Sequence, residues 1–101
     1  MTIVVVLFNL KPGVAAADYE KFAREMDLPQ VNRLPSVLGF EVLKSQGLMG
    51  GGASPFQYIE ILRLKSVEQL GQDAQSPVMQ QVVSTFQSMA DNPQFIVTQA
   101  L

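Results

Sequence analysis

One carboxylate lies where local sequence rules disfavour it. Asp27 comes near the end of an amphipathic helical pattern, two residues before Pro29. A negative charge at the carboxyl end of a helix opposes the helix dipole, and local rules are often broken where a residue has a functional role. Asp27 is therefore our main candidate for general acid or base catalysis. The structural alternative is that its side chain accepts backbone N–H bonds in the turn before the proline.

Three more polar residues lie on two segments that we expect to be neighbouring strands. Tyr58 and Glu60 alternate along one strand, so both point to the same face of the sheet, and Glu41 lies on the adjacent strand. A carboxylate between Ile59 and Ile61 is costly to bury unless it is paired or protonated. Burial near a second carboxylate raises its pKa into the range useful for acid–base work. Alternatively, this face is partly wet, or the glutamates pair with arginines.

The stretch "QGLMGGGASP", residues 46–55, holds four of the chain's seven glycines. A phosphate-binding loop needs a lysine, a following hydroxyl and a helix behind them, whereas these glycines lead into a strand pattern. The stretch therefore predicts a mobile hairpin connection. Its Leu48 and Met49 are candidates for the apolar underside of a lid over a pocket, and both are expected to contact substrate.

Two further residues are candidates for binding a substrate. Asn9 ends the first strand and could orient a carbonyl or hydroxyl group, although an asparagine there is more often a turn residue. Phe22 lies on the apolar stripe of the first helix, where an aromatic ring could contact a flat ligand. Tyr19 lies on the same stripe and is interpreted as a core residue with its hydroxyl at the margin.

Composition excludes several classes of protein. The chain has 101 residues, which fits one domain over residues 1–101, and a net charge of −2 gives no basic surface for nucleic acid. There is no cysteine and no histidine, so thiolate metal sites, zinc hydrolase sites and Ser-His-Asp triads cannot form in this chain alone. We expect no metal and no cofactor. Charged residues make up only 16 %, which predicts an apolar surface patch and a homodimer.

The first ten residues, "MTIVVVLFNL", are apolar but too short to span a bilayer. They lack the basic start and the small-residue cleavage site of a secretory signal. We therefore expect a cytoplasmic protein without a membrane partner.

Hydrophobic periodicity orders the chain as strand, helix, strand, strand, helix, strand. The pattern predicts strands at residues 3–8, 37–44, 56–64 and 94–101, helices at 15–26 and from 77 to about 90, and shorter helical turns at 30–34 and 67–71. This order is a ferredoxin-like βαββαβ fold of class α+β with a four-stranded antiparallel sheet. Its strands are apolar on both sides, which favours a dimer in which two sheets pack face to face.

Several segments, in order, carry a family resemblance. The stretches "MTIVVVLFNLKPGV", "ADYEKFAREMDLPQVNRLPSVLGFEVL", "GLMGGGASPFQYIEIL" and "ADNPQFIVTQAL" resemble the REDY-like HapK family along nearly the whole chain. The resemblance implies a dimeric α+β barrel and a role in prodigiosin-type (tripyrrole or alkaloid) pigment biosynthesis without a cofactor. Other dimeric α+β barrels often read His-x-Pro at the exit of the first helix, where this chain has Asp27-Leu28-Pro29.

Together these features predict a small protein that binds a planar pyrrole-like or indole-like intermediate between helices and sheet. Proton transfer, dehydration or assisted condensation would fit Asp27 as acid or base, with Tyr58 and Glu60 completing the catalytic group. A second hypothesis is a carrier that binds a reactive intermediate without converting it. A third is a dimerisation module without a ligand.

Overall fold

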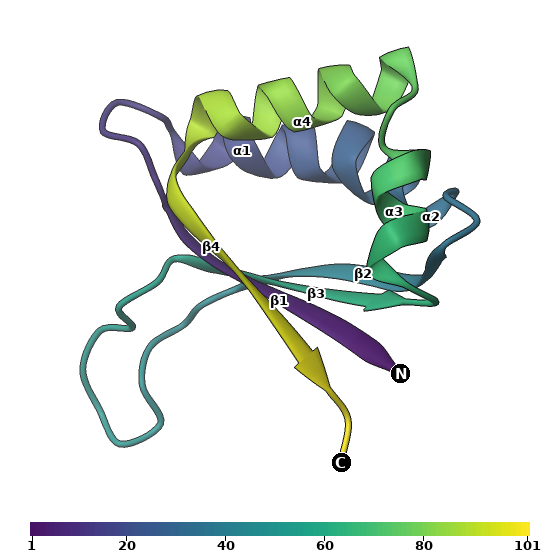
Figure 1. Cartoon of the computed structure of the whole chain (residues 1–101). Coiled ribbons are helices and arrows are strands. Elements are labelled where there is room, and N and C mark those ends of the chain that lie inside the picture. The colour runs from purple at the N-terminus through teal and green to yellow at the C-terminus, as the bar shows by residue number, and fades with distance from the viewer.

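A computed structural model describes all 101 residues and has the predicted ferredoxin-like arrangement. The four strands form one antiparallel sheet in the order β2-β3-β1-β4, and all the helices cover one of its faces (Figure 1). The elements in chain order are β1 (Thr2–Leu10), α1 (Ala16–Phe22), η1 (Ala23–Asp27), α2 (Leu28–Asn32), β2 (Val37–Lys44), β3 (Tyr58–Leu64), α3 (Val67–Asp73), α4 (Pro77–Met89) and β4 (Ala90–Gln99).

The core lies between the sheet and the helices. Alternate residues of β1 are buried there, because successive side chains of a strand point to opposite faces: Val4, Val6, Phe8 and Leu10. The ring of Phe8 packs edge-on against Phe86 of α4, with the ring centroids 5.0 Å apart. This aromatic packing fixes the spacing between the sheet and the helical layer.

The first helix is longer than its sequence pattern indicates. The expectation that it ends near Met26 is wrong, because the helical path continues through η1, a π-helical turn, into α2. Leu28 N–H donates to the carbonyl of Ala23, five residues back, and Pro29, which has no N–H to contribute, takes a place in the first turn of α2. Asp27 is therefore within a continuous helical segment, not at an exposed helix end.

The last strand begins earlier than expected. β4 starts at Ala90, and the expected break at residues 91–93 is a bulge in the strand, where the register with β1 shifts between Leu7 and Asn9. Asn92 has a φ of 45°, which asparagine tolerates better than most residues. Pro93 fits because β4 is an edge strand and one side of its backbone needs no partner.

The glycine-rich stretch forms the connection between β2 and β3. In Figure 1 this segment extends beyond the end of the sheet and away from the helices. Gly51 and Gly52 both have positive φ values, in a turn where Leu48 N–H donates to the carbonyl of Gly52 at 3.0 Å. Glycine is therefore required here by the backbone conformation.

The face of the sheet opposite the helices carries a band of apolar side chains that are partly buried or, at Ile96, exposed. It is formed by Ile3, Val5, Leu7, Ile59, Ile61 and Ile96, and we call it the outer face. Because no element of this chain covers it, it remains available for a partner. None of the helices combines the length and the apolar composition that crossing a membrane requires.

Candidate functional site

A cavity of about 220 Å³ lies between the sheet and the helical layer. Most of its wall is hydrophobic and comes from α2, α4 and the strands, with the rings of Phe40, Phe86 and Phe95 among the lining side chains. Its only ionisable side chains are Asp27 and Glu60. We call it the carboxylate cavity. Such a space, apolar with a few polar groups, is typical of small-molecule binding sites.

Asp27 is held in the wall of this cavity by the π-helical turn. Its side chain is 5 % exposed, and it makes no hydrogen bond or ion pair with the rest of the chain. The alternative in which it accepts backbone N–H bonds before Pro29 is therefore not observed. Burial raises the pKa of Asp27 to about 7, because the charged form loses its hydration and gains no partner.

Glu60 lies on the side of β3 that faces the helices, and it is as deeply buried as Asp27. Burial raises the pKa of Glu60 to about 8, the nearby charge of Asp27 adds to this, and a hydrogen bond from Tyr19 acts in the opposite direction. The two carboxyl groups interact, so they are expected to titrate as a coupled pair. The structure thus brings together two of the three predicted catalytic residues.

Tyr19 is a candidate site residue that the sequence interpretation assigned to the core. Its side chain is fully buried, and its hydroxyl donates a hydrogen bond to Oε2 of Glu60 at 3.2 Å. Burial raises its pKa far above the usual value, so the hydroxyl stays protonated and acts as a donor. Tyr19, Ala23 and Asp27 are spaced i, i+4, i+8, which puts them on one helix face. This spacing could have indicated from the sequence that Tyr19 lies near Asp27.

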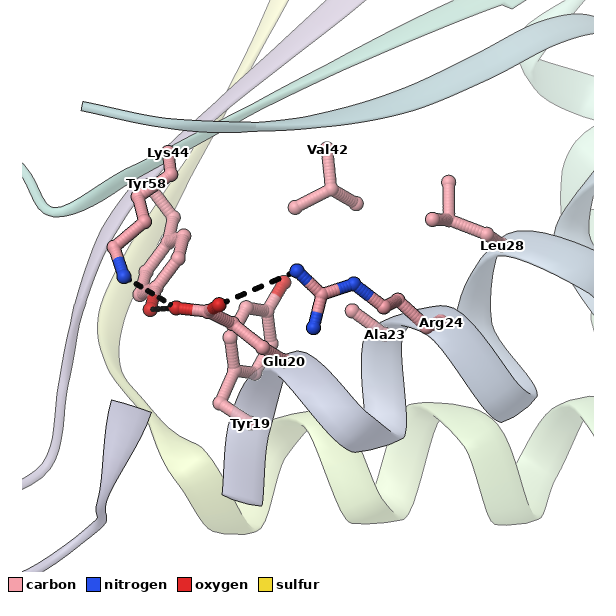
Figure 2. A pocket seen from close by; sticks show the side chains of 8 residues that line it. All are labelled: Tyr19, Glu20, Ala23, Arg24, Leu28, Val42, Lys44 and Tyr58. Carbon is pink, nitrogen blue, oxygen red and sulfur yellow. Dashed lines mark hydrogen bonds and ion pairs between the residues drawn. The ribbon is translucent and has the colours of Figure 1, made fainter. Parts of the chain in front are cut away.

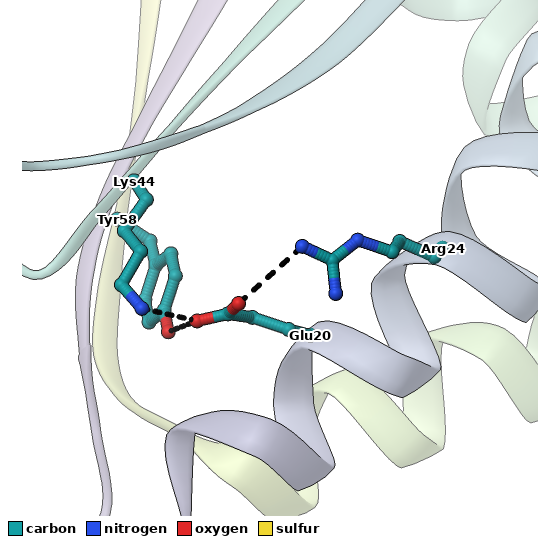
Figure 3. A network of polar contacts seen from close by, with 4 residues as sticks. All are labelled: Glu20, Arg24, Lys44 and Tyr58. Atoms are coloured by element: carbon teal, nitrogen blue, oxygen red, sulfur yellow. Dashed lines mark hydrogen bonds and ion pairs between the residues drawn. The ribbon is translucent and has the colours of Figure 1, made fainter.

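Tyr58 shares the inner face with Glu60, as predicted, but its hydroxyl serves a different cavity. It donates to Oε2 of Glu20 at 2.7 Å beside a smaller space of about 120 Å³, which we call the Glu20 cavity (Figure 2). Lys44 and Arg24 also contact the Glu20 carboxylate, at 2.8 and 3.5 Å (Figure 3). The hydrogen bonds from Lys44 and Tyr58 lower the pKa of Glu20, so this carboxylate is ionised.

Asn9 and Glu41 make contacts away from the carboxylate cavity. The amide of Asn9 accepts from the backbone N–H of Gln57 at 2.9 Å and donates to the carbonyl of Pro55 at 3.1 Å, so it holds the end of the glycine-rich connection. Glu41 pairs in register with Ile61 and therefore lies on the outer face, where it binds Arg63 at 2.7 Å. The arginine pairing that the sequence left open is the one observed.

The remaining predicted contacts are also absent from the cavity wall. Leu48 and Met49 are exposed in the extended connection and line none of the cavities, because the connection projects away from the helices. Phe22 is buried in the core, where its ring packs against Tyr19 at a centroid distance of 6.2 Å. In this chain the lid and the Phe22 contact thus have no geometric support.

The arrangement can exchange protons with a bound molecule. Two carboxyl groups with raised pKa values face an apolar space, and one of them is oriented by a tyrosine hydroxyl. No three acidic side chains come close enough together to hold a metal ion. Acid–base chemistry is what the two carboxyl groups themselves can supply.

Similar folds occur among solved structures. HapK from Hahella chejuensis matches with a TM-score of 0.81 and 20 % identity over 100 % of this chain and 93 % of its own. SnoaB, a cofactor-independent oxygenase from Streptomyces nogalater, matches with a TM-score of 0.77 and 12 % identity over 99 % and 92 %. A dimeric ferredoxin-like protein from Thermobifida fusca matches with a TM-score of 0.74 and 13 % identity over 98 % and 90 %.

These structures share the fold at low sequence identity. A search among curated proteins found no match. The model of the family described as REDY-like protein HapK matches residues 2–101. This match covers both carboxyl groups of the cavity and every element that positions them, and the chain therefore belongs to the HapK family of REDY-like proteins.

Proposed function

We propose that this protein binds a planar heteroaromatic intermediate in the carboxylate cavity and moves protons on it, with Asp27 as the general acid or base. One observation carries the proposal: Asp27 is buried in an apolar cavity without a partner, and its pKa is raised to about 7. A group with a pKa near the working pH can both donate and accept a proton. No structural need of the fold explains such a carboxylate.

Glu60 and Tyr19 complete the proposed catalytic group. Glu60 holds a second proton near Asp27, and the Tyr19 hydroxyl orients it through the 3.2 Å hydrogen bond. One carboxyl group then delivers a proton to the ligand while the other receives one. Proton transfer, dehydration and assisted condensation all need this pairing of an acid with a base.

The family supports a biosynthetic setting for this chemistry. We infer a role in a prodigiosin-type pigment pathway, and membership of the HapK family supports this inference. The structurally similar SnoaB is described as a cofactor-independent oxygenase, which supports chemistry without a cofactor on this fold. The Thermobifida fusca relative is described as dimeric, and the apolar outer face of our chain supports a homodimer here too.

The test is incubation of the purified protein with pyrrole-type and indole-type pathway intermediates, followed by mass spectrometry. We expect conversion by the wild type and, at saturating ligand, a rate lower by about 10²- to 10⁴-fold in Asp27→Asn, so that weaker binding of the ligand does not account for the loss. Glu41→Gln is the matched control, because it removes an equal charge from the outer face. Binding without conversion by the wild type would instead support the carrier function, and an unchanged rate in Asp27→Asn would refute the catalytic role.

A further inference from the structure

We propose that the carboxylate cavity selects flat ligands that carry a positive charge, such as a protonated or alkylated nitrogen heterocycle. The inference rests on the proposed function, because it names the charge of the ligand that the same cavity binds. It follows from the charges of the cavity wall, which holds two carboxyl groups and no basic side chain to pair with them.

The charges around the cavity are all of one kind. Asp27 and Glu60 are its only ionisable lining residues, and none of the chain's seven lysines and arginines lines it. Tyr19, which faces Glu60 from α1, supplies one neutral hydrogen bond. The elements that close the rest of the wall, α2, α3, α4 and the other strands, contribute no charged group. Two carboxylates therefore share this space without a counter-charge.

The Glu20 cavity shows how this protein stabilises a carboxylate that is ionised. Glu20 is surrounded by Lys44, Arg24 and the hydroxyl of Tyr58 (Figures 2 and 3). Its pKa is lowered, whereas the pKa of the unpartnered Asp27 is raised. A charged carboxylate in an apolar site is stable only when a cation or several donors accompany it. In the carboxylate cavity, a bound cationic ligand would stabilise the ionised carboxylates in this way.

The walls of the cavity suit an aromatic cation. The rings of Phe40, Phe86 and Phe95 line it, and the rings of Phe86 and Phe95 meet edge to face with centroids 6.3 Å apart. Aromatic faces attract cations, and the attraction grows when water is excluded. An anionic ligand would meet two carboxyl groups and no positive charge, with the neutral amide of Gln87 as the one other polar side chain of the wall, so we expect the cavity to reject it.

Binding of a cation changes the protonation of the pair. A positive charge beside a carboxyl group favours its ionised form. When a permanent cation binds at neutral pH, a protonated carboxyl group of the cavity therefore ionises and releases its proton to solvent. Raising the pH removes this proton in advance. The affinity for a permanent cation should therefore rise with pH until both carboxyl groups are ionised.

The experiment compares three flat aromatic probes of similar size by isothermal titration calorimetry. They are N-methylquinolinium, which carries a permanent positive charge, 1-naphthamide, which is neutral, and 1-naphthoate, which is negative. At pH 8.5 we expect N-methylquinolinium to bind at least tenfold more tightly than 1-naphthamide, and more tightly than at pH 6. Titrations at pH 7 in two buffers of different ionisation enthalpy should show proton release on binding of the cation and none for the amide.

Variants connect the effect to the two carboxyl groups. Asp27→Asn and Glu60→Gln should each lose most of the preference for N-methylquinolinium and most of the proton release, whereas Glu41→Gln, an acid removed from the outer face, should keep both. Circular dichroism confirms that each variant is folded. If one of the two fails to fold, the other variant and the wild-type comparison of probes and pH values still decide.

Two failures can be told apart. If 1-naphthamide or 1-naphthoate binds as tightly as N-methylquinolinium at pH 8.5, or if no probe binds, charge selection is refuted, while conversion of pathway intermediates can still support the proposed function. If the cation is preferred as expected but Asp27→Asn converts intermediates at the wild-type rate, the acid–base function fails and charge selection stands.

Discussion

At the scale of single residues, Asp27 and Glu60 are unfavourable for folding. Burial without a cation costs free energy whenever either group is ionised, and the protein reduces this cost by keeping them protonated. Such a cost is common at functional sites, where residues are selected for chemistry rather than stability. It also gives the stability of the chain an unusual dependence on pH.

We expect the free energy of unfolding to fall as the pH rises from 5 to 8. The folded-state pKa values of Asp27 and Glu60 lie above their unfolded values of 3.8 and 4.5, so in this range the folded state holds protons that the unfolded chain has already lost. The loss should be on the order of 6 kcal/mol, because each group contributes about 1.4 kcal/mol per pH unit over roughly two to three units of this range. Urea unfolding at pH 5, 6.5 and 8 measures it.

Variants assign this dependence to the pair. Asp27→Asn and Glu60→Gln should each flatten it, while Glu41→Gln should leave it unchanged. Glu20 and Asp73 have lowered pKa values, so they stabilise the folded state throughout pH 5 to 8. Their contribution is lost only at lower pH, where both groups become protonated. A wild-type stability that rises between pH 5 and 8 would contradict this assignment.

Tyr19→Phe should raise the pKa of Glu60 further. The substitution removes the hydroxyl that donates to the ionised carboxylate and leaves the ring, which packs against Phe8 with centroids 5.4 Å apart. Carboxyl ¹³C chemical shifts followed against pH measure the change. An unchanged or lowered pKa of Glu60 in this variant would show that the hydrogen bond has no part in tuning the site.

At the scale of elements, the π-helical turn and Asn32 shape the cavity. The turn, η1, sets Asp27 into the wall, and Asn32 at the end of α2 joins the helices to β2. The Asn32 amide donates to the carbonyl of Phe40 at 3.1 Å and accepts from its N–H at 3.0 Å. It thus acts as a short strand partner for β2, whose Phe40 ring lines the cavity.

Asn32→Ala should lower the free energy of unfolding by about 2 kcal/mol. The substitution removes both partly buried hydrogen bonds and leaves the N–H and the carbonyl of Phe40 unpaired. Asn32→Asp keeps the acceptor and loses the donor, so it should fall between wild type and Asn32→Ala. The midpoint of urea unfolding, at an unchanged slope, measures the effect. Equal midpoints for all three proteins would remove Asn32 as a link between helix and sheet.

Local patterns predicted the elements but not the details of the site. The strand β1 could be predicted from its continuous run of apolar residues, and the glycine-rich connection from its own composition. The caps at Ser66 and Ser76, which each accept a backbone N–H, also follow from neighbouring residues. The π-helical turn could not be predicted in this way, because the pattern around Asp27 also fits a helix that ends. Two of the three partners of Glu20, Lys44 and Tyr58, lie 24 and 38 residues away, and such pairs depend on the strand register and on how α1 lies across the sheet.

At the scale of the whole molecule, the outer face is the surface that remains available for association. The helices cover one side of the sheet only (Figure 1). The other side carries aliphatic side chains on three adjacent strands. A surface of this kind favours association. The two-sided apolar pattern of the strands predicted this face from the sequence, whereas no feature of the sequence predicted the contour of the cavity on the other side.

Ile61→Asp should convert a homodimer of this chain into monomers at micromolar concentration. Ile61 lies on β3 in the middle of the outer face, between Val5 of β1 and Glu41 of β2, so a carboxylate there would add a second negative charge beside Glu41 and would be costly to bury in a dimer. Sedimentation velocity measures the mass. Val78→Asp, on the exposed side of α4, is the control and should remain dimeric. A monomeric wild type, or a dimeric Ile61→Asp, would exclude association through this face.

The central claim, a coupled pair of carboxyl groups poised near neutral pH in an apolar cavity, is tested most directly by ¹³C NMR of the side-chain carboxyl groups. Spectra of Asp27→Asn and Glu60→Gln assign the two signals. We predict that Asp27 and Glu60 titrate with pKa values of about 7 and about 8 in the folded wild type. If every carboxyl group of the folded protein titrates below pH 5, the pair is not poised and the central claim is contradicted.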